Sequence, residues 1–271
     1  MLNELDEQTV GRVARVNDGA EAATPANGRF RVSQTKASTT DTVLSYLVAG
    51  TATPGDAADY TPLAGTVTIA AGATSAEIVV PVLNDLLVEQ TETVVVTLSA
   101  VTSGDPDIGM DQANKTATVS ILDEITVVSI EAGDAAASEP GADQGQFLVV
   151  LAGQRQAPLG GIQVSYTVSG DATPGTDYTA LSGVATIPAG QSSVPIPVAV
   201  LNDNVVELPE SVVVTLTGVN HPNVAIDTAA NQDTVTINDD DPTTVSITAS
   251  DATASEPGTD DGQFTVALGG G

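Results

Sequence analysis

The segment Asn202–Glu210, NDNVVELPE, combines residue types that could hold a metal ion. It contains three carboxylates, Asp203, Glu207 and Glu210, and the amide of Asn202. Carboxylate and amide oxygens are the ligands that Ca²⁺ takes in proteins. The same arrangement occurs 118 residues earlier in Asn84–Glu92, NDLLVEQTE, where Asp85, Glu89 and Glu92 keep the spacing. We therefore predict two calcium-binding loops.

Both loops lie between segments with the alternation of β-strands. SVPIPVAVL (193–201) precedes the second loop and SVVVTLTGV (211–219) follows it. Alternation of apolar and polar residues with period two is typical of strands that bury one face. The acidic segment is therefore expected to be a loop that connects two strands.

Internal repetition extends over most of the chain. Phe30, Phe147 and Phe264 are each 117 residues apart, Tyr60 and Tyr178 are 118 apart, and Tyr46 and Tyr166 lie in similar segments. All seven aromatic residues thus occupy repeat-equivalent positions, where we expect core anchors. A fixed period of this kind indicates repeated domains. We predict an N-terminal junction segment at 1–7, repeat 1 at 8–124, repeat 2 at 125–241, and the first two strands of a third repeat at 242–271.

Each repeat contains enough short strands for a sandwich. In repeat 2 the predicted strands are 126–131, 145–152, 161–168, 183–188, 193–201, 211–217 and 233–238. Glycine, proline, asparagine or aspartate bounds most of them, and no helical period is present. Seven such strands predict an all-β fold, with tandem seven-stranded antiparallel β-sandwiches of the immunoglobulin-like type.

That topology should bring distant acids to one end of each sandwich. The loops after the first, third and fifth strands and the end of the last strand lie at the same end. In repeat 2 these places carry Glu139, Asp177, the acids of 203–210, and Asp239–Asp241. Two carboxylates about 4 Å apart repel by about 4 kcal/mol at an effective dielectric of about 20. A hard divalent cation removes this repulsion, and calcium suits such a crowded oxygen site better than magnesium.

Composition narrows the classes of partner and of reaction. There are 35 Asp+Glu against 7 Lys+Arg, a formal net charge of −28, which argues against nucleic acid and against insertion into a membrane. The absence of cysteine and the presence of one histidine, His221, disfavour zinc. An active site usually occurs once, whereas these acids recur in each repeat, so we expect no enzyme. No long apolar run and no signal peptide are present, so a secretion signal would lie outside this chain.

The chain resembles tandem Calx-beta domains. The resemblance rests on ATPGTDYT, GVATIPAGQSSVPIPV, NDNVVELPESVVVTL and INDDD in repeat 2, and on GTATPGDAADYT, GTVTIAAGATSAEIVV and NDLLVEQTETVVVTL in repeat 1. It implies a calcium-binding immunoglobulin-like sandwich of the kind found in long bacterial surface proteins and in sodium–calcium exchangers. The calcium ligands that it implies in repeat 2 are Glu139, Asp177, Asp203, Glu207, Glu210, Asp239, Asp240 and Asp241.

Repeat 1 departs from this pattern at two positions. We expect Thr24 where repeat 2 has Glu139, and Leu122 where it has Asp239. The ligands that the resemblance implies there are Asp59, Asp85, Glu89, Glu92, Asp123 and Glu124. The sequence therefore predicts a weaker calcium site in repeat 1.

These observations predict an extracellular or cell-surface protein whose calcium-rigidified sandwiches form a stalk or fibre with an adhesive role. Its partners would be calcium ions and neighbouring repeats or subunits of the same protein. One alternative is a regulatory calcium sensor. For residues 243–268 two interpretations stay open: a fragment cut from a longer chain, or strands donated to a neighbouring subunit to build a filament.

Overall fold

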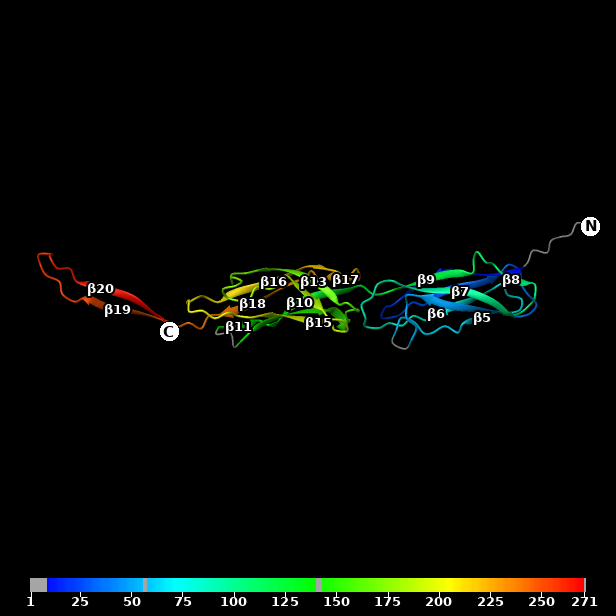
Figure 1. Ribbon diagram of the computed structural model, residues 1–271, viewed down its shortest axis with the longest axis horizontal. Helices are drawn as coiled ribbons and strands as arrows, with labels where there is room; N and C mark the ends of the chain where they lie inside the picture. Colours follow the sequence, from blue (N-terminus) through cyan, green and yellow to red (C-terminus); the bar gives the residue numbers. More distant parts are fainter. Residues whose placement is uncertain (1–8, 56–57, 140–142, 271) are drawn as a thin grey trace, which may run out of the picture. The chain divides into compact units, whose positions relative to one another are not determined.

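The computed structural model describes residues 9–55, 58–139 and 143–270 (Figure 1). Within these residues the fold is all-β, and the helical structure is one 3₁₀ turn at Ala152–Gln154. The chain divides into two compact units, Met1–Thr126 and Val127–Gly271. The predicted fold class, all-β with tandem β-sandwiches, is confirmed. The junction segment predicted at 1–7 lies outside the described residues.

The first domain pairs two sheets. One has the strand order β6-β3-β1-β8 and the other β2-β9-β7-β4-β5. The strands are β1 (Thr9–Asn17), β2 (Gly19–Ala20), β3 (Gly28–Gln34), β4 (Thr42–Gly50), β5 (Thr66–Ile69), β6 (Ser75–Val80), β7 (Glu92–Ser103), β8 (Ile108–Met110) and β9 (Thr116–Leu122).

The second domain repeats this topology. Its sheets have the orders β15-β12-β10-β17 and β11-β18-β16-β13-β14. The strands are β10 (Thr126–Asp134), β11 (Ala136–Ser138), β12 (Gly145–Leu151), β13 (Ile162–Ser169), β14 (Val184–Ile187), β15 (Ser193–Val198), β16 (Glu210–Val219), β17 (Val224–Ile226) and β18 (Gln232–Asn238). All seven strands predicted for repeat 2 are present. The short strands β11 and β17 lie at sheet edges and were not predicted; β11 pairs in parallel with β18.

Alternating side chains of the strands form each core. Along β12 the odd residues from Gly145 to Leu151 are buried, and the even ones are only partly covered. Phe30 and Phe147 are fully buried at the centre of their domains, and four tyrosines are buried with them. These six aromatics are the core anchors that the repeat predicted. Burial of their apolar surface stabilises the two layers against each other.

A separate two-stranded sheet follows the second domain. It consists of β19 (Thr243–Asp251) and β20 (Gln263–Gly270), paired antiparallel. Phe264 on β20 is 70% exposed, so the expectation that all seven aromatics are core anchors is wrong for this residue. The reason is physical: in the described part of the chain, this hairpin has no second sheet to cover its apolar face.

Candidate metal centre

The same three acids meet in each domain. In the first domain, carboxylate oxygens of Asp59, Glu89 and Glu92 lie within 4.8 Å of one another. In the second domain, those of Asp177, Glu207 and Glu210 do so. Each triad combines a buried aspartate from the loop after the third long strand with two partly buried glutamates. One glutamate lies in the loop after the fifth long strand, and the other is the first residue of the strand that follows. We call each set the acidic triad of its domain.

Backbone geometry holds the buried aspartate of each triad in place. The N–H of Thr53 donates to Asp59 Oδ2, and the N–H of Thr173 donates to Asp177 Oδ2. The two aspartates also accept hydrogen bonds at their backbone carbonyls, from Leu83 and Leu201 respectively. These bonds tie the aspartate loop to the start of the glutamate loop, so sequence-distant acids converge.

Glycines with positive φ begin the aspartate loops. Gly50 ends β4 with φ +130°, and Gly170 follows β13 with φ +122°. A Cβ atom at Gly170 would lie 2.0 Å from the carbonyl oxygen of Ser211, and one at Gly50 would lie 2.0 Å from that of Thr93. Because only glycine accepts this conformation and this contact, it is required where each loop leaves its strand.

A second group of acids lies beside each triad. In the second domain it comprises Glu139 with Asp203 and Asp241, and Glu139 with Asp239 and Asp240. In the first domain it comprises Glu21 with Asp85 and Glu89. Glu21 and Glu139 are each 4% exposed. Together with the triads, these groups bring nearly all the predicted ligands into two clusters.

Glu21 was not among the predicted site residues, and the expectation that Thr24 takes the position of Glu139 is wrong. The N–H of Glu21 donates to Leu122 O, just as the N–H of Glu139 donates to Asn238 O. The backbone bridge that closes the loop joins Ala20 to Ala26 in the first domain but Ser138 to Asp143 in the second. The loop of the first domain is therefore one residue longer, so the offset between the repeats changes from 118 at Glu21 to 117 at Phe30. The offset of 118 residues that relates Tyr60 to Tyr178 would have identified Glu21.

The expectation that Leu122 replaces Asp239 is also wrong. Asp123 Oδ2 accepts a hydrogen bond from the N–H of Glu89 at 2.8 Å, and Asp239 Oδ2 accepts one from the N–H of Glu207 at 3.0 Å. Asp123 is therefore the equivalent of Asp239, and Glu124 follows it as Asp240 follows Asp239. The remaining difference at this strand end is Ile125, which stands where the second domain has Asp241.

The clustered carboxylates of the first domain raise one another's pKa values. Burial, together with the charges of Asp85 and Asp123, raises the pKa of Glu21 to about 8. Burial and the neighbouring Asp59 raise the pKa of Glu92 to about 8 and that of Glu89 to about 7. Each shift reflects the cost of placing one more negative charge in a cluster that water only partly screens.

The second domain shows the same effect. A hydrogen bond to Asp177, followed by burial, raises the pKa of Glu210 to about 7. Burial also raises the pKa of Glu139, Glu207 and Asp241, and neighbouring carboxylates add to each shift. Both clusters therefore repel internally when all their acids are ionised.

The donor set fits a hard cation. Arg15 pairs with Asp18, and Arg29 and Arg31 pair with Glu77, so three of the seven basic side chains bind acids that lie outside both clusters. Glu21 Oε2 and Asp241 Oδ2 are buried acceptors without a hydrogen-bond partner within the described residues. Buried acceptors of this kind are costly unless a cation or donor reaches them. Many carboxylate oxygens with no sulfur or histidine among them match the preference of Ca²⁺.

His221 lies away from the strand ends that carry these acids. It is partly exposed in the turn between β16 and β17, where its Nδ1 accepts a hydrogen bond from the N–H of Asn223 at 3.3 Å. The clusters are therefore composed of oxygen donors only.

One protein-family model matches two consecutive segments of the chain. The Calx-beta domain model matches residues 6–125 and again residues 126–241. This chain belongs to the Calx-beta family. Calx-beta domains are non-catalytic and typically bind calcium, which agrees with the acidic clusters at equivalent positions of both domains. A search of curated protein sequences finds no match.

Solved structures similar to this Calx-beta chain include Calx domains and an adhesin. The calcium binding domain CBD12 of CALX1.1 is 18% identical over 78% of this chain and 81% of that chain, with a TM-score of 0.34. The apo form of the Calx CBD1 domain is 24% identical over 43% of this chain and 99% of that chain, with a TM-score of 0.36. The Yersinia pseudotuberculosis adhesin InvE is 8% identical over 84% of this chain and 58% of that chain, with a TM-score of 0.32.

One further property concerns membranes. Among the residues that the structure describes, no helix is long and apolar enough to cross a bilayer.

Proposed function

We propose that this chain is a calcium-binding structural segment of an extracellular stalk or fibre. The observation that supports it is the recurrence of one acidic triad in both domains, Asp59–Glu89–Glu92 and Asp177–Glu207–Glu210. Residues 239–241 and Glu139 in the second domain, and Asp85, Asp123 and Glu124 with Glu21 in the first, would complete the two sites. A role repeated in each domain suits a structural ion better than a single catalytic centre.

The chain connection links the first site to the second domain. Asp123 and Glu124 directly follow β9, and β10 begins at Thr126. The N–H of Ala23 donates to Glu124 Oε1, which ties this segment back to the loop after β2. An ion held by Asp123 and Glu124 would restrict the few residues that join the domains. We therefore expect calcium to stiffen the junction.

Small-angle X-ray scattering tests this role. The maximum dimension and the flexibility of the full chain should differ between saturating calcium and chelator. The control is a variant with both triad aspartates changed, Asp59→Asn and Asp177→Asn, which should show a reduced response. If the wild-type chain gave the same maximum dimension in both conditions, the stiffening role would be wrong.

A regulatory calcium sensor is the runner-up. A sensor should respond at micromolar calcium with a large structural change, whereas a structural segment should saturate nearer millimolar calcium and mainly gain rigidity. Isothermal calorimetry on the full chain distinguishes the two by the calcium concentration at half-saturation.

The exposed hairpin favours a second candidate, a filament subunit that donates residues 243–268 to a neighbouring copy. Val245, Ile247, Phe264, Val266 and Leu268 are all at least 66% exposed. Their equivalents in the second domain, Val128, Ile130, Phe147, Val149 and Leu151, are at most 3% exposed. Electron microscopy at high protein concentration with calcium tests this: filaments would support it, and monomers alone would exclude it.

A further inference from the structure

The two domains differ at one sheet edge. Strands β6 and β15 are equivalent edge strands, with sequences SAEIVV and SVPIPV. Pro195 and Pro197 on β15 stand where β6 has Glu77 and Val79. Proline on an edge strand prevents the addition of another strand, because it has no N–H to donate. Prolines therefore block the addition of a strand at this edge of the second domain, and β6 of the first domain has no proline at the equivalent positions.

Hydrogen-bond alternation shows that these positions face the open edge. The N–H of Gln34 donates to Thr74 O, and the N–H of Leu151 donates to Ser192 O. In an antiparallel pair, successive residues point their N–H groups toward the partner strand and away from it in turn. From these registers, the N–H groups of Ser75, Glu77 and Val79 point away from β3. Positions 195 and 197 point away from β12 in the same way.

The open edge of β6 is limited to a short stretch. Beyond it, the N–H of Thr61 donates to Pro81 O, and Tyr60 bridges to Val82. Within the described part of the chain, β6 itself pairs with β3 alone. Ser75–Val79 is thus a strand edge with free backbone donors and acceptors.

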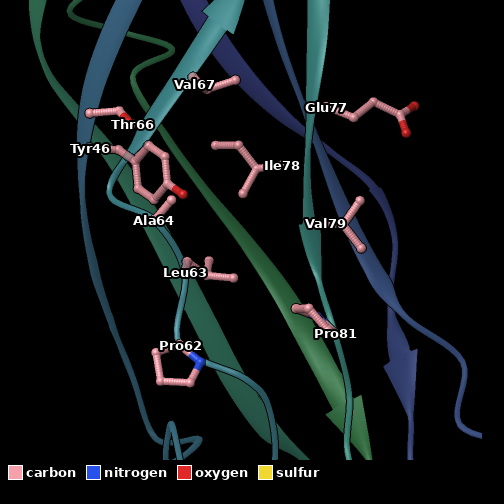
Figure 2. Close-up of a pocket in the computed structure, with 10 residues that line it drawn as sticks. All are labelled: Tyr46, Pro62, Leu63, Ala64, Thr66, Val67, Glu77, Ile78, Val79 and Pro81. Atoms are coloured by element: carbon pink, nitrogen blue, oxygen red, sulfur yellow. The ribbon is translucent and has the colours of Figure 1, made fainter.

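A pocket of about 240 Å³, lined by both polar and apolar groups, opens beside this edge (Figure 2). Tyr46, Leu63 and Val67 are among the residues that line it from the other sheet and the loop before β5. From β6, the lining residues are Glu77, Ile78 and Val79. Figure 2 shows the Ile78 side chain directed toward Tyr46, with Glu77 and Val79 on the other side of the strand. In the second domain, Ser182 stands where the pocket has Ala64 and lies 3.4 Å from the hydroxyl of Tyr166. The first domain therefore has an opening beside its unblocked edge.

The charge around the edge permits an approach by a second anionic chain. The sheet that ends in β6 carries four of the seven basic residues, Arg12, Arg15, Arg29 and Arg31, all exposed. Two of them neutralise Glu77: Arg29 at 2.8 Å and Arg31 at 3.6 Å. The equivalent positions of Arg12, Arg29 and Arg31 in the second domain are Ser129, Gln146 and Leu148. In a chain of net charge −28, this sheet is where repulsion between copies is weakest.

We propose that β6 is a self-association edge, through which two copies of this chain pair antiparallel about a twofold axis. The interface is isologous, so each copy supplies the same strand and the same pocket. An axis through Ile78 places each Glu77 opposite Val79 of the second copy. An axis through Glu77 would instead place two like charges directly opposite, which is unfavourable. The two pockets would then meet beneath the continuous sheet and exclude water from one another.

Sedimentation velocity on the full chain tests the pairing. Because the paired stretch is short, dimer should increase with concentration up to about 1 mM chain, as for other small interfaces. The double variant Glu77→Pro, Val79→Pro should remain monomeric over this range. The second domain shows that the sandwich accepts proline at both positions, and the melting temperature checks that the variant is folded.

A matched variant separates the backbone from the side chains. Glu77→Gln with Val79→Ala keeps both N–H groups and should still dimerise. In the opposite direction, Pro195→Glu with Pro197→Val should add a second pairing edge and increase association. The proposal would be overturned if the wild-type chain stayed monomeric at all concentrations, or if the folded proline variant dimerised like the wild type.

Cross-linking tests the register. The chain has no cysteine, so single substitutions report cleanly. A mixture of Glu77→Cys and Val79→Cys chains should form a disulfide-linked heterodimer, because opposed residues in a hydrogen-bonded pair are about 5.5 Å apart at Cα. Each variant alone should give far less cross-linked product. Efficient cross-linking of Glu77→Cys alone would contradict an axis through Ile78.

The salt dependence of dimerisation and a variant of the β19–β20 hairpin together identify which segment pairs with the edge. Pairing between two like-charged chains should become stronger as salt rises, because screening weakens their repulsion. Phe264→Ser with Val266→Ser should leave this dimer intact, so the result is independent of strand donation. A dimer that the hairpin variant abolished, or that weakened with salt, would show that another segment occupies the edge and would overturn the proposal. Measurements in both calcium and chelator keep this test separate from the calcium role.

Discussion

At the residue scale, the most informative side chain is Glu21. It is 4% exposed, its Oε2 has no hydrogen-bond partner in the described residues, and its pKa is raised to about 8 by burial and by nearby acids. A carboxylate in this setting destabilises the fold by itself and stabilises it once a cation is bound. The same residue should therefore affect calcium binding and calcium-free stability in opposite directions.

Glu21→Gln tests this expectation. Removal of one charged ligand should weaken calcium binding by the first domain about tenfold or more, since a hydrogen bond or contact to a charged group contributes about 1.5–3 kcal/mol. In chelator, the same variant should raise the melting temperature of the first domain, because repulsion with Asp85 and Asp123 is relieved. Isothermal titration calorimetry measures the calcium affinity, and differential scanning calorimetry measures the melting temperature. Glu77→Gln, outside the cluster, is the control and should leave calcium affinity unchanged.

The pKa values of Glu21, Glu89 and Glu92 predict the pH dependence of the calcium-free first domain. Folded-state pKa values of about 7 to 8 lie above the ordinary value of 4.5, so the folded state binds more protons than the unfolded state between these limits. Stability from these groups is then present at low pH and is lost as pH rises toward 8. In chelator, the melting temperature should fall between pH 5 and pH 8.

Saturating calcium should cancel this fall, because calcium binds the ionised carboxylates and its affinity rises with pH. Differential scanning calorimetry at several pH values, with and without calcium, provides the measurement. A calcium-free melting temperature that rose from pH 5 to pH 8 would contradict the raised pKa values.

At the element scale, the site depends on how each loop leaves its strand. The aspartate loop begins at Gly50 or Gly170, the glutamate loop begins after β6 or β15, and the last strand of each sandwich ends at the third acidic segment. The strand ends thus hold the two ends of each acidic loop in fixed positions, and the loop is anchored where it leaves its strand. Changes at these connections should affect folding and calcium binding together.

Gly170→Ala is the test at this scale. Its Cβ would lie 2.0 Å from Ser211 O, and φ is +122°, so either the loop or β16 must move. We expect the second domain to lose about 1–3 kcal/mol of unfolding free energy, with weaker calcium binding at the Asp177 triad. Gly218→Ala is the matched control, because its Cβ would meet nothing closer than 3.9 Å and should change stability by about 0.5 kcal/mol or less. Equal effects of the two variants would contradict the role of Gly170.

At the scale of the whole molecule, two similar domains carry two similar clusters with one difference. Asp241 in the second domain has a buried, unpartnered Oδ2, whereas Ile125 at the equivalent position is 75% exposed. Glu21 and Asp123 are the equivalents of Glu139 and Asp239, so those positions no longer distinguish the two sites. The prediction of a weaker first site therefore depends on Ile125. We therefore expect the two domains to differ in calcium affinity because of this position.

Thermal unfolding with increasing calcium tests the difference. Binding to the folded state alone stabilises a domain by about 2.7 kcal/mol when calcium is at 100 times its dissociation constant. The transition of the second domain should move at lower calcium than that of the first. Ile125→Asp should bring the two responses together, and Asp241→Asn should weaken the second. If the first domain responded at lower calcium in the wild type, the assignment of Asp241 would be wrong.

The sequence by itself predicted the family, the long strands and the residues of the acidic triads. Period-two alternation marks strands because one face of each is buried, and the 118-residue spacing relates Asp59, Glu89 and Glu92 to their partners in the second domain. These signals are local or periodic, so they can be read along one dimension. The tertiary structure decided the rest. It placed Glu21 rather than Thr24 in the cluster, matched Asp123 to Asp239, and left Phe264 exposed. It also showed which N–H groups of β6 face outward. Each of these depends on the partner that a backbone group pairs with across the sheet, and a loop one residue longer is enough to hide that partner from the sequence.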